Sequence, residues 1–192
     1  MRRICIIVAV ATIGVTATVG AAQAAPTWLT RGQMQAALLT ADEVNAAVPQ
    51  SLPVAAGKDS FSPRRQKATT FPFHWTKFTV AQGYVREFTA VDGAVPLTTV
   101  PVAVEFYETA SPAAARKWLA ALGTAPNPTP NITNEVKNGV FIVVMDAGSF
   151  FAVNVGTRVG RSFVGATCNG KERAATIACA TAVMNAQKTK LR

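Results

Sequence analysis

The feature that most constrains this fold is a pair of cysteines, Cys168 and Cys179, in a chain whose N-terminus marks it for export. Residues 1–24 combine a positively charged start, a long apolar run and a small-residue exit, Ala-Gln-Ala. This layout is typical of a secretory signal peptide, which we expect to be cleaved after Ala24. Cleavage also removes Cys5, so two cysteines remain in the mature chain.

An uncleaved membrane anchor is the alternative interpretation of the apolar run. The run is marginal for a bilayer span of about 20 residues, and it contains Thr12, Gly14, Thr16 and Thr18. No cysteine stands at a cleavage point after it, so a lipid anchor is not expected. After Ala25 no apolar run approaches membrane length. The mature product is therefore predicted to be soluble and secreted, without a stable membrane anchor.

The compartment favours pairing of the two remaining cysteines, because disulfides persist outside the cytoplasm. Their spacing of eleven residues is not that of a C-x-x-C redox motif. A structural zinc site needs four Cys or His ligands, whereas the mature chain offers these two cysteines and His74. No metal site is expected, and a structural disulfide between Cys168 and Cys179 should stabilise the fold by about 2–3 kcal/mol.

Residues 25–192 suffice for one domain with a substantial core, and local patterns predict its helices. Two short helices are expected near the N-terminus, the second beginning at Thr40 with a capping box to Glu43. Ser111, followed by a proline, begins a third helix. The last helix is expected at about 171–188, with Asn169 and Glu172 as its capping pair.

Alternating and β-branched segments predict the strands of an antiparallel sheet. These segments are 73–80, 83–90, 98–109, 140–145, 150–155 and 161–167. The last three are joined by a turn at 146–149 and by a turn or bulge at 156–160, both containing glycine. The aperiodic stretch 49–70 is predicted to be a long surface loop, and 124–131 a shorter one. The expected architecture is α+β, with about five to seven strands, helices packed on one face and helices near both termini.

The disulfide restricts where the last helix begins. Paired cysteines have Cα atoms about 4.4–6.8 Å apart. A straight helix from Lys171 would carry Cys179 about 12 Å along its axis. A start nearer Ala174, with the helix crossing the end of the preceding strand, is therefore preferred.

The mature chain is basic: without Arg2 and Arg3, the 19 lysines and arginines and 10 acids leave a net charge of +7. One basic group surrounds the predicted long loop and comprises Lys58, Arg64, Arg65, Lys67 and Lys77. Such a surface suits anionic envelope polymers or an acidic protein partner, although a solvated face is the simpler interpretation. Export and the lack of a recognisable nucleic-acid module argue against nucleic acid.

Signatures of catalysis are absent from the sequence. His74 is the single histidine, so a hydrolase with a Ser-His-Asp or Cys-His site would have to use it. It lies among aromatic residues with no G-x-S-x-G motif nearby, and a structural or surface role is the simpler interpretation. No phosphate-binding loop, dinucleotide fingerprint or calcium loop occurs. We therefore expect neither enzymatic activity nor a cofactor.

The remaining class is a binding domain. Ligand pockets combine apolar or aromatic walls with a few polar groups. The candidate ligand-binding residues of these types are His74, Trp75, Tyr84, Arg86, Glu105 and Tyr107. Glu87 and Glu105, on neighbouring predicted strands, are a further candidate pair of carboxylates.

Three segments carry a resemblance to a known family: "LLTADEVNAAV", "SPAAARKWLAAL" after a strand, and "IACATAVMNA" in the last helix. Together they resemble the PknH-like extracellular sensor domains of actinobacteria, over most of residues 36–188. The resemblance implies an α+β sensor fold with a groove for an extracellular ligand and no established catalytic residues. The chain departs from the kinase-linked members, which have a kinase domain, a retained membrane span and two disulfides. It therefore implies a free, secreted, sensor-like domain that binds a small or envelope-derived ligand.

Overall fold

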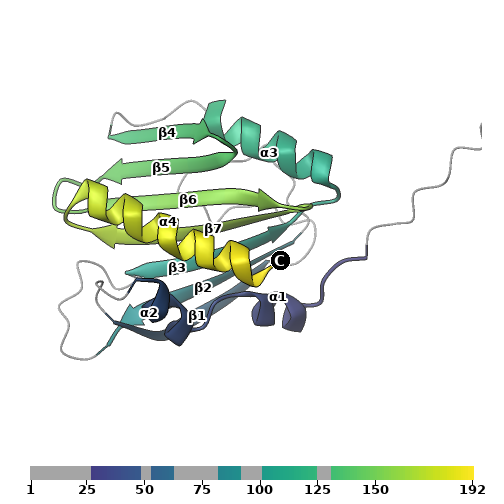
Figure 1. The fold of residues 1–192 in the computed structure, drawn as a ribbon, viewed down its shortest axis with the longest axis horizontal. Coiled ribbons are helices and arrows are strands. Elements are labelled where there is room, and N and C mark those ends of the chain that lie inside the picture. Colours follow the sequence, from purple (N-terminus) through teal and green to yellow (C-terminus); the bar gives the residue numbers. More distant parts are fainter. Residues whose placement is uncertain (1–26, 49–52, 63–81, 92–100, 125–130) are drawn as a thin grey trace, which may run out of the picture.

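The structure, a computed structural model, describes residues 27–48, 53–62, 82–91, 101–124 and 131–192 (Figure 1). The predicted signal peptide and the strand predicted at 73–80 lie outside these residues. The helices are α1 (Arg31–Ala37), α2 (Ala41–Ala47), α3 (Pro112–Thr124) and α4 (Arg173–Lys190). The strands are β1 (Val54–Ser62), β2 (Gln82–Ala90), β3 (Val102–Glu108), β4 (Ile132–Lys137), β5 (Val140–Asp146), β6 (Phe151–Val159) and β7 (Ser162–Gly170).

In the described part of the chain, seven strands form one antiparallel sheet in the order β1-β2-β3-β7-β6-β5-β4. The sheet consists of two meanders, β1–β3 and β4–β7, which join where β3 pairs with β7. Tight turns connect the strands of the second meander. Between β4 and β5, Asn138 and Gly139 both have positive φ, 53° and 73°, as a two-residue hairpin turn requires.

Helices cover both faces of the sheet. On one face, α1, α2 and α4 enclose the larger core, in which Val104, Val155 and Ala166 are completely buried. In Figure 1, α4 (yellow) runs across β6 and β7. On the other face, Trp118 and Leu122 of α3 pack on Phe163 and neighbouring side chains of β5. Every residue of β3 is buried, because β3 has neighbours on both faces.

The disulfide fastens the first half of α4 to the sheet. Cys168 of β7 and Cys179 of α4 are bonded, and their Cα atoms are 6.2 Å apart. Strand β7 continues to Gly170 and α4 begins at Arg173, so the chain reverses within two residues and the helix returns over the strand. The predicted bond is therefore present, and the helix begins between the two positions considered from the sequence.

Buried polar contacts fasten the second half of α4 to the segment between α1 and α2. The fully buried Gln187 side chain donates to the Ala37 carbonyl (2.7 Å) and accepts from the Leu39 N–H (2.9 Å). Lys190 donates to the Leu38 carbonyl (3.0 Å) and pairs with Glu43 (2.6 Å). Both halves of α4 are thus held in place by specific bonds.

The first described residues are fixed to the same sheet by Glu108, which is buried at the end of β3. Glu108 accepts from the Leu29 N–H (3.1 Å) and from Gln82, whose amide also donates to the Leu29 carbonyl (2.7 Å). The guanidinium of Arg161 pairs with Glu108 and lies over the Trp28 ring, 5.1 Å from its centre. The start of the domain therefore lies against the ends of β2, β3 and β7.

The fold class, the number of strands and the helices near both termini are as predicted. Both N-terminal helices begin at capping boxes, on Thr30 and on Thr40. The expectation of helices on one face differs from the structure, because α3 packs on the face opposite α4. The reason is that apolar side chains such as Phe141 and Phe163 project to the α3 face, whereas their sequence neighbours project to the α4 face.

Three local predictions are wrong, and one strand was not predicted. The predicted loop 49–70 contains β1, whose alternation is interrupted by a bulge between Ala56 and Asp59. Strand β4 was missed beside the breaker-rich loop. Strand β6 continues to Val159 through most of the turn or bulge predicted at 156–160, and the absence of a Cβ at Gly156 leaves room for the Phe163 ring. The predicted Asn169–Glu172 capping pair is not used, since Glu172 is the N-cap and makes no side-chain cap bond.

We expect replacement of both Cys168 and Cys179 by alanine to lower the free energy of unfolding by about 2–3 kcal/mol, because the unfolded chain then gains the entropy of an open loop. Urea unfolding followed by circular dichroism measures this loss. The control is the wild type before and after reduction of its disulfide, and reduction should lower its free energy of unfolding by a similar amount. A loss well under 1 kcal/mol in both would contradict a stabilising role for the bond.

We expect Gln187→Ala to lower the free energy of unfolding by about 2–4 kcal/mol, since it leaves a buried N–H and a partly buried carbonyl without their partner. Asn185→Ala, at an exposed position of the same helix, is the matched control and should change stability by less than about 0.5 kcal/mol. Equal effects of the two substitutions in urea unfolding would show that the contacts of Gln187 do not hold α4.

Candidate functional site

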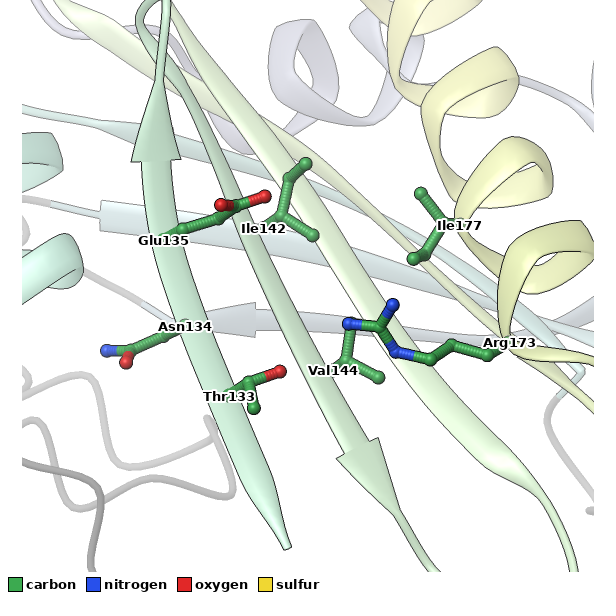
Figure 2. Close-up of a pocket in the computed structure, with 7 residues that line it drawn as sticks. All are labelled: Thr133, Asn134, Glu135, Ile142, Val144, Arg173 and Ile177. Carbon is green, nitrogen blue, oxygen red and sulfur yellow. The ribbon is translucent and has the colours of Figure 1, made fainter.

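A groove lies between the first turns of α4 and the β4–β5 edge of the sheet (Figure 2). Its volume is about 240 Å³, and it is lined by Thr133, Asn134, Glu135, Ile142, Val144, Arg173 and Ile177. The groove exists because α4 packs on β6 and β7, and the sheet extends two strands further. The helix forms one wall and β4 forms the other.

The floor of the groove is apolar. Ile142 and Val144 of β5 and Ile177 of α4 line this floor (Figure 2). The strand register places Thr133 opposite Val144 and Glu135 opposite Ile142, so these two polar side chains of β4 face the same side as the floor. The groove therefore offers an apolar base beside a polar wall.

Two opposite charges flank this floor. Arg173 and Glu135 are both exposed, and neither side chain makes a hydrogen bond or ion pair in the described part of the chain. In Figure 2 the Arg173 side chain extends from α4 across the groove over Val144. Arg173 also opens α4, whose N-cap makes no side-chain cap bond, so the positive end of the helix dipole adds to its charge.

The polar side chains of the lining can meet a ligand through charge and hydrogen bonds, and the lining contains neither histidine nor cysteine. Among the described residues, no group of three His, Cys, Asp or Glu side chains is placed to hold a metal ion.

A second polar cluster lies on the α3 face, in the middle of the sheet. Asn154 donates to Glu105 (2.9 Å) and to Thr167 (2.8 Å), and Thr167 donates to the same carboxylate oxygen, Oε1 (3.2 Å). Glu105 and Asn154 are only 6% and 7% exposed. The other two oxygens, Glu105 Oε2 and Asn154 Oδ1, are buried and accept no hydrogen bond.

Burial raises the pKa of Glu105 to about 7, against the opposing effect of the hydrogen bonds from Thr167 and Asn154. No lysine or arginine of the described residues pairs with this carboxylate. Protonation of Glu105 near neutral pH therefore removes the free-energy cost of a buried, unpaired charge. The neutral acid also gains a donor, which suits a cluster in which both unpaired atoms are acceptors.

The candidate binding residues predicted from the sequence do not share one pocket. Tyr84 and Arg86 lie on the α4 face, where both bind Asp59, at 3.0 Å and 2.9 Å. Glu105 and Tyr107 lie on the α3 face, where Tyr107 packs edge-on against Trp118. His74 and Trp75 are outside the described residues, so a role in ligand binding stays a prediction for them.

Asp59 and Arg86 act as a structural pair. The Arg86 guanidinium donates to Asp59 and holds the pKa of that carboxyl below its ordinary value. Arg86 also donates to the Leu39 carbonyl (3.1 Å), and Asp59 accepts from Gln35 (3.1 Å). The pair thus ties β1 and β2 to the α1–α2 segment. Glu87 and Glu105 are not a directly opposed pair, because Glu105 is opposite Val85.

Of the predicted basic group, Lys58 is exposed on β1. Arg64, Arg65, Lys67 and Lys77 lie outside the described residues. Contact with an anionic polymer therefore stays a prediction.

None of the residues that line the groove was predicted from the sequence. Thr133 and Glu135 alternate with the apolar Ile132 and Val136 in "ITNEVK", which is a short strand signal. The breaker-rich residues before it obscured that signal. No local pattern could have placed Arg173, because its position over β5 depends on the path of α4 across the sheet.

No known protein-family model matches the chain, and no curated protein matches it. Its fold is similar to the crystal structure of the extracellular domain of PknH from Mycobacterium tuberculosis, with a TM-score of 0.53 and 12% identity. The match covers 84% of this chain and 97% of that chain. At this identity the likeness shows the fold alone, and it supports the resemblance seen in the sequence in that respect only.

The raised pKa of Glu105 has a measurable effect on stability. Its ordinary pKa is 4.5 and its folded pKa is about 7, so between these values the folded chain keeps a proton that the unfolded chain has lost. We expect the contribution of Glu105 to the free energy of unfolding to be complete below pH 4.5. It should decline as pH rises through 7, by up to about 3 kcal/mol.

Glu105→Gln should remove that decline in urea unfolding between pH 4 and pH 8, because the amide does not titrate. Glu135→Gln changes an exposed carboxyl and should leave the decline as in the wild type. Identical pH profiles for wild type and Glu105→Gln would show that Glu105 titrates normally.

Proposed function

We propose that this chain is a non-enzymatic, sensor-like domain that acts outside the cytoplasmic membrane and binds a small or envelope-derived ligand. The observation that carries the proposal is the groove between α4 and β4–β5, with its apolar floor and its unpaired Arg173 and Glu135. Charged groups with no protein partner, beside an apolar floor, are suited to a ligand that supplies the missing partners.

Three observations support a location outside the cytoplasm. The sequence begins with the pattern of an export signal. Cys168 and Cys179 are joined in a disulfide, a bond that persists in oxidising compartments. The similar fold belongs to an extracellular domain. As a separate finding, none of the helices in the described residues has the length and hydropathy of a membrane span.

The size of the groove limits the ligand. Its volume of about 240 Å³ lies just below the usual range for sites that enclose a drug-sized molecule, roughly 300–1,000 Å³. A small metabolite, or one end group of a larger envelope molecule, fits this space. Each methylene group that such a ligand buries on the floor contributes about 0.8 kcal/mol.

The test is native mass spectrometry of the protein purified from its own culture medium, with and without a blocked groove. Thr133→Trp places a large side chain on the groove wall. Val136→Trp makes the same change on the same strand, but on the opposite face, and serves as the control. We expect a retained small-molecule mass in the wild type and in Val136→Trp, and its loss in Thr133→Trp.

Retention of that mass by Thr133→Trp at the wild-type level would place the ligand elsewhere. A wild-type protein free of any bound mass would equally contradict the proposal.

A further inference from the structure

The two charged side chains of the groove stand on facing walls and do not neutralise each other. Arg173 projects from α4 and Glu135 from β4, and no ion pair forms between them. The apolar side chains of Ile142, Val144 and Ile177 lie between these walls. A ligand that spans the groove therefore meets the Arg173 cation, then the apolar floor, then the Glu135 anion.

We propose that this groove binds a zwitterionic ligand of the amino-acid or short-peptide class, with its acid group at Arg173 and its amino group at Glu135. The inference rests on the proposed function and specifies the ligand class of the same site. The body of the ligand covers Val144 and Ile177.

The α4 wall is built for an acid group. Arg173 presents a planar guanidinium that can donate two parallel hydrogen bonds to a carboxylate. The first turn of α4 adds N–H groups without a side-chain cap and contains no acidic residue after the N-cap, Glu172. Both features favour a negative charge on this side of the groove.

The β4 wall is built for an amino group. The carboxylate of Glu135 accepts hydrogen bonds and carries the opposite charge to an ammonium group. The Thr133 hydroxyl, two residues away on the same face, is a second acceptor. Lys137 follows on that face but makes no ion pair with Glu135 in the described structure, so the carboxylate remains available.

The pair of charges also selects against simpler ligands. A ligand with an acid group alone meets Arg173 favourably but leaves Glu135 unpaired beside it. A ligand with an amino group alone has the reverse disadvantage. Only a ligand with both groups satisfies both walls, which is how opposed charges produce specificity.

The experiment uses the dipeptide alanyl-leucine and three blocked forms of it, acetylated at the amino end, amidated at the acid end, or both. Each is titrated at millimolar concentration into the intact mature protein, and binding is followed by the NMR signals of the Ile142, Val144 and Ile177 methyl groups. We expect the free dipeptide to shift these signals with a Kd about three- to five-fold lower than either singly blocked form.

Charge-neutral variants then assign each preference to its wall. Arg173→Gln should lose the preference for the free acid over the amide and keep the preference for the free amine. Glu135→Gln should do the reverse. Lys137→Gln changes a charge on the same face that does not line the groove, and it should keep both preferences.

Equal binding of all four peptides, or preferences that survive in Arg173→Gln and Glu135→Gln, would overturn the proposal. Peptide binding that shifts none of the three methyl groups would overturn it as well. If all four peptides fail to bind while Thr133→Trp still abolishes retention of the natural ligand, the ligand class is wrong and the proposed function stands.

Discussion

The position of α4 across the sheet is the constraint on which the rest of the structure depends. Its buried face completes the larger core with Val183 and Met184, which lie over β6, β7 and β3. A covalent bond holds one half of the helix to β7, and the buried amide of Gln187 holds the other half to the α1–α2 segment. A helix held at two points cannot slide or roll, so the wall that it presents to the groove has a defined position.

The groove follows from the difference in width between one helix and this sheet. A helix with its side chains is about 10–12 Å across, whereas neighbouring strands are about 4.7–4.9 Å apart. One helix therefore covers about two strands. On the α4 face, α4 lies over β6 and β7, and α1 and α2 lie toward β1 and β2. Strands β5 and β4 extend beyond α4, and the residues of β4 that face this side are polar, as solvent contact requires.

Much of this fold could be predicted from short-range signals, whereas the site could not. The capping box at Thr40, the proline-started helix after Ser111 and the disulfide each depend on residues close in sequence. Strand β1 escaped detection because its bulge between Ala56 and Asp59 breaks the alternation. Within a strand, residues two apart share a face, and this alternation correctly groups Tyr84 with Arg86, and Glu105 with Tyr107. The register between β2 and β3, which pairs Tyr84 with Phe106, then puts the two groups on opposite faces, and a single sequence does not encode that register locally.

The junction between the two meanders bears on how the chain reaches its native state. Hairpins within the β4–β7 meander join neighbouring segments, so they close short loops at small entropic cost. The β3–β7 ladder instead joins Glu108 to Ser162 and must close a loop that contains α3 and three strands. We therefore expect this central ladder to be the slow step of folding. Since Cys168 lies on β7 and Cys179 on the next helix, their bond can form before that step. Strand β7 and α4 would then already be joined when β7 pairs with β3.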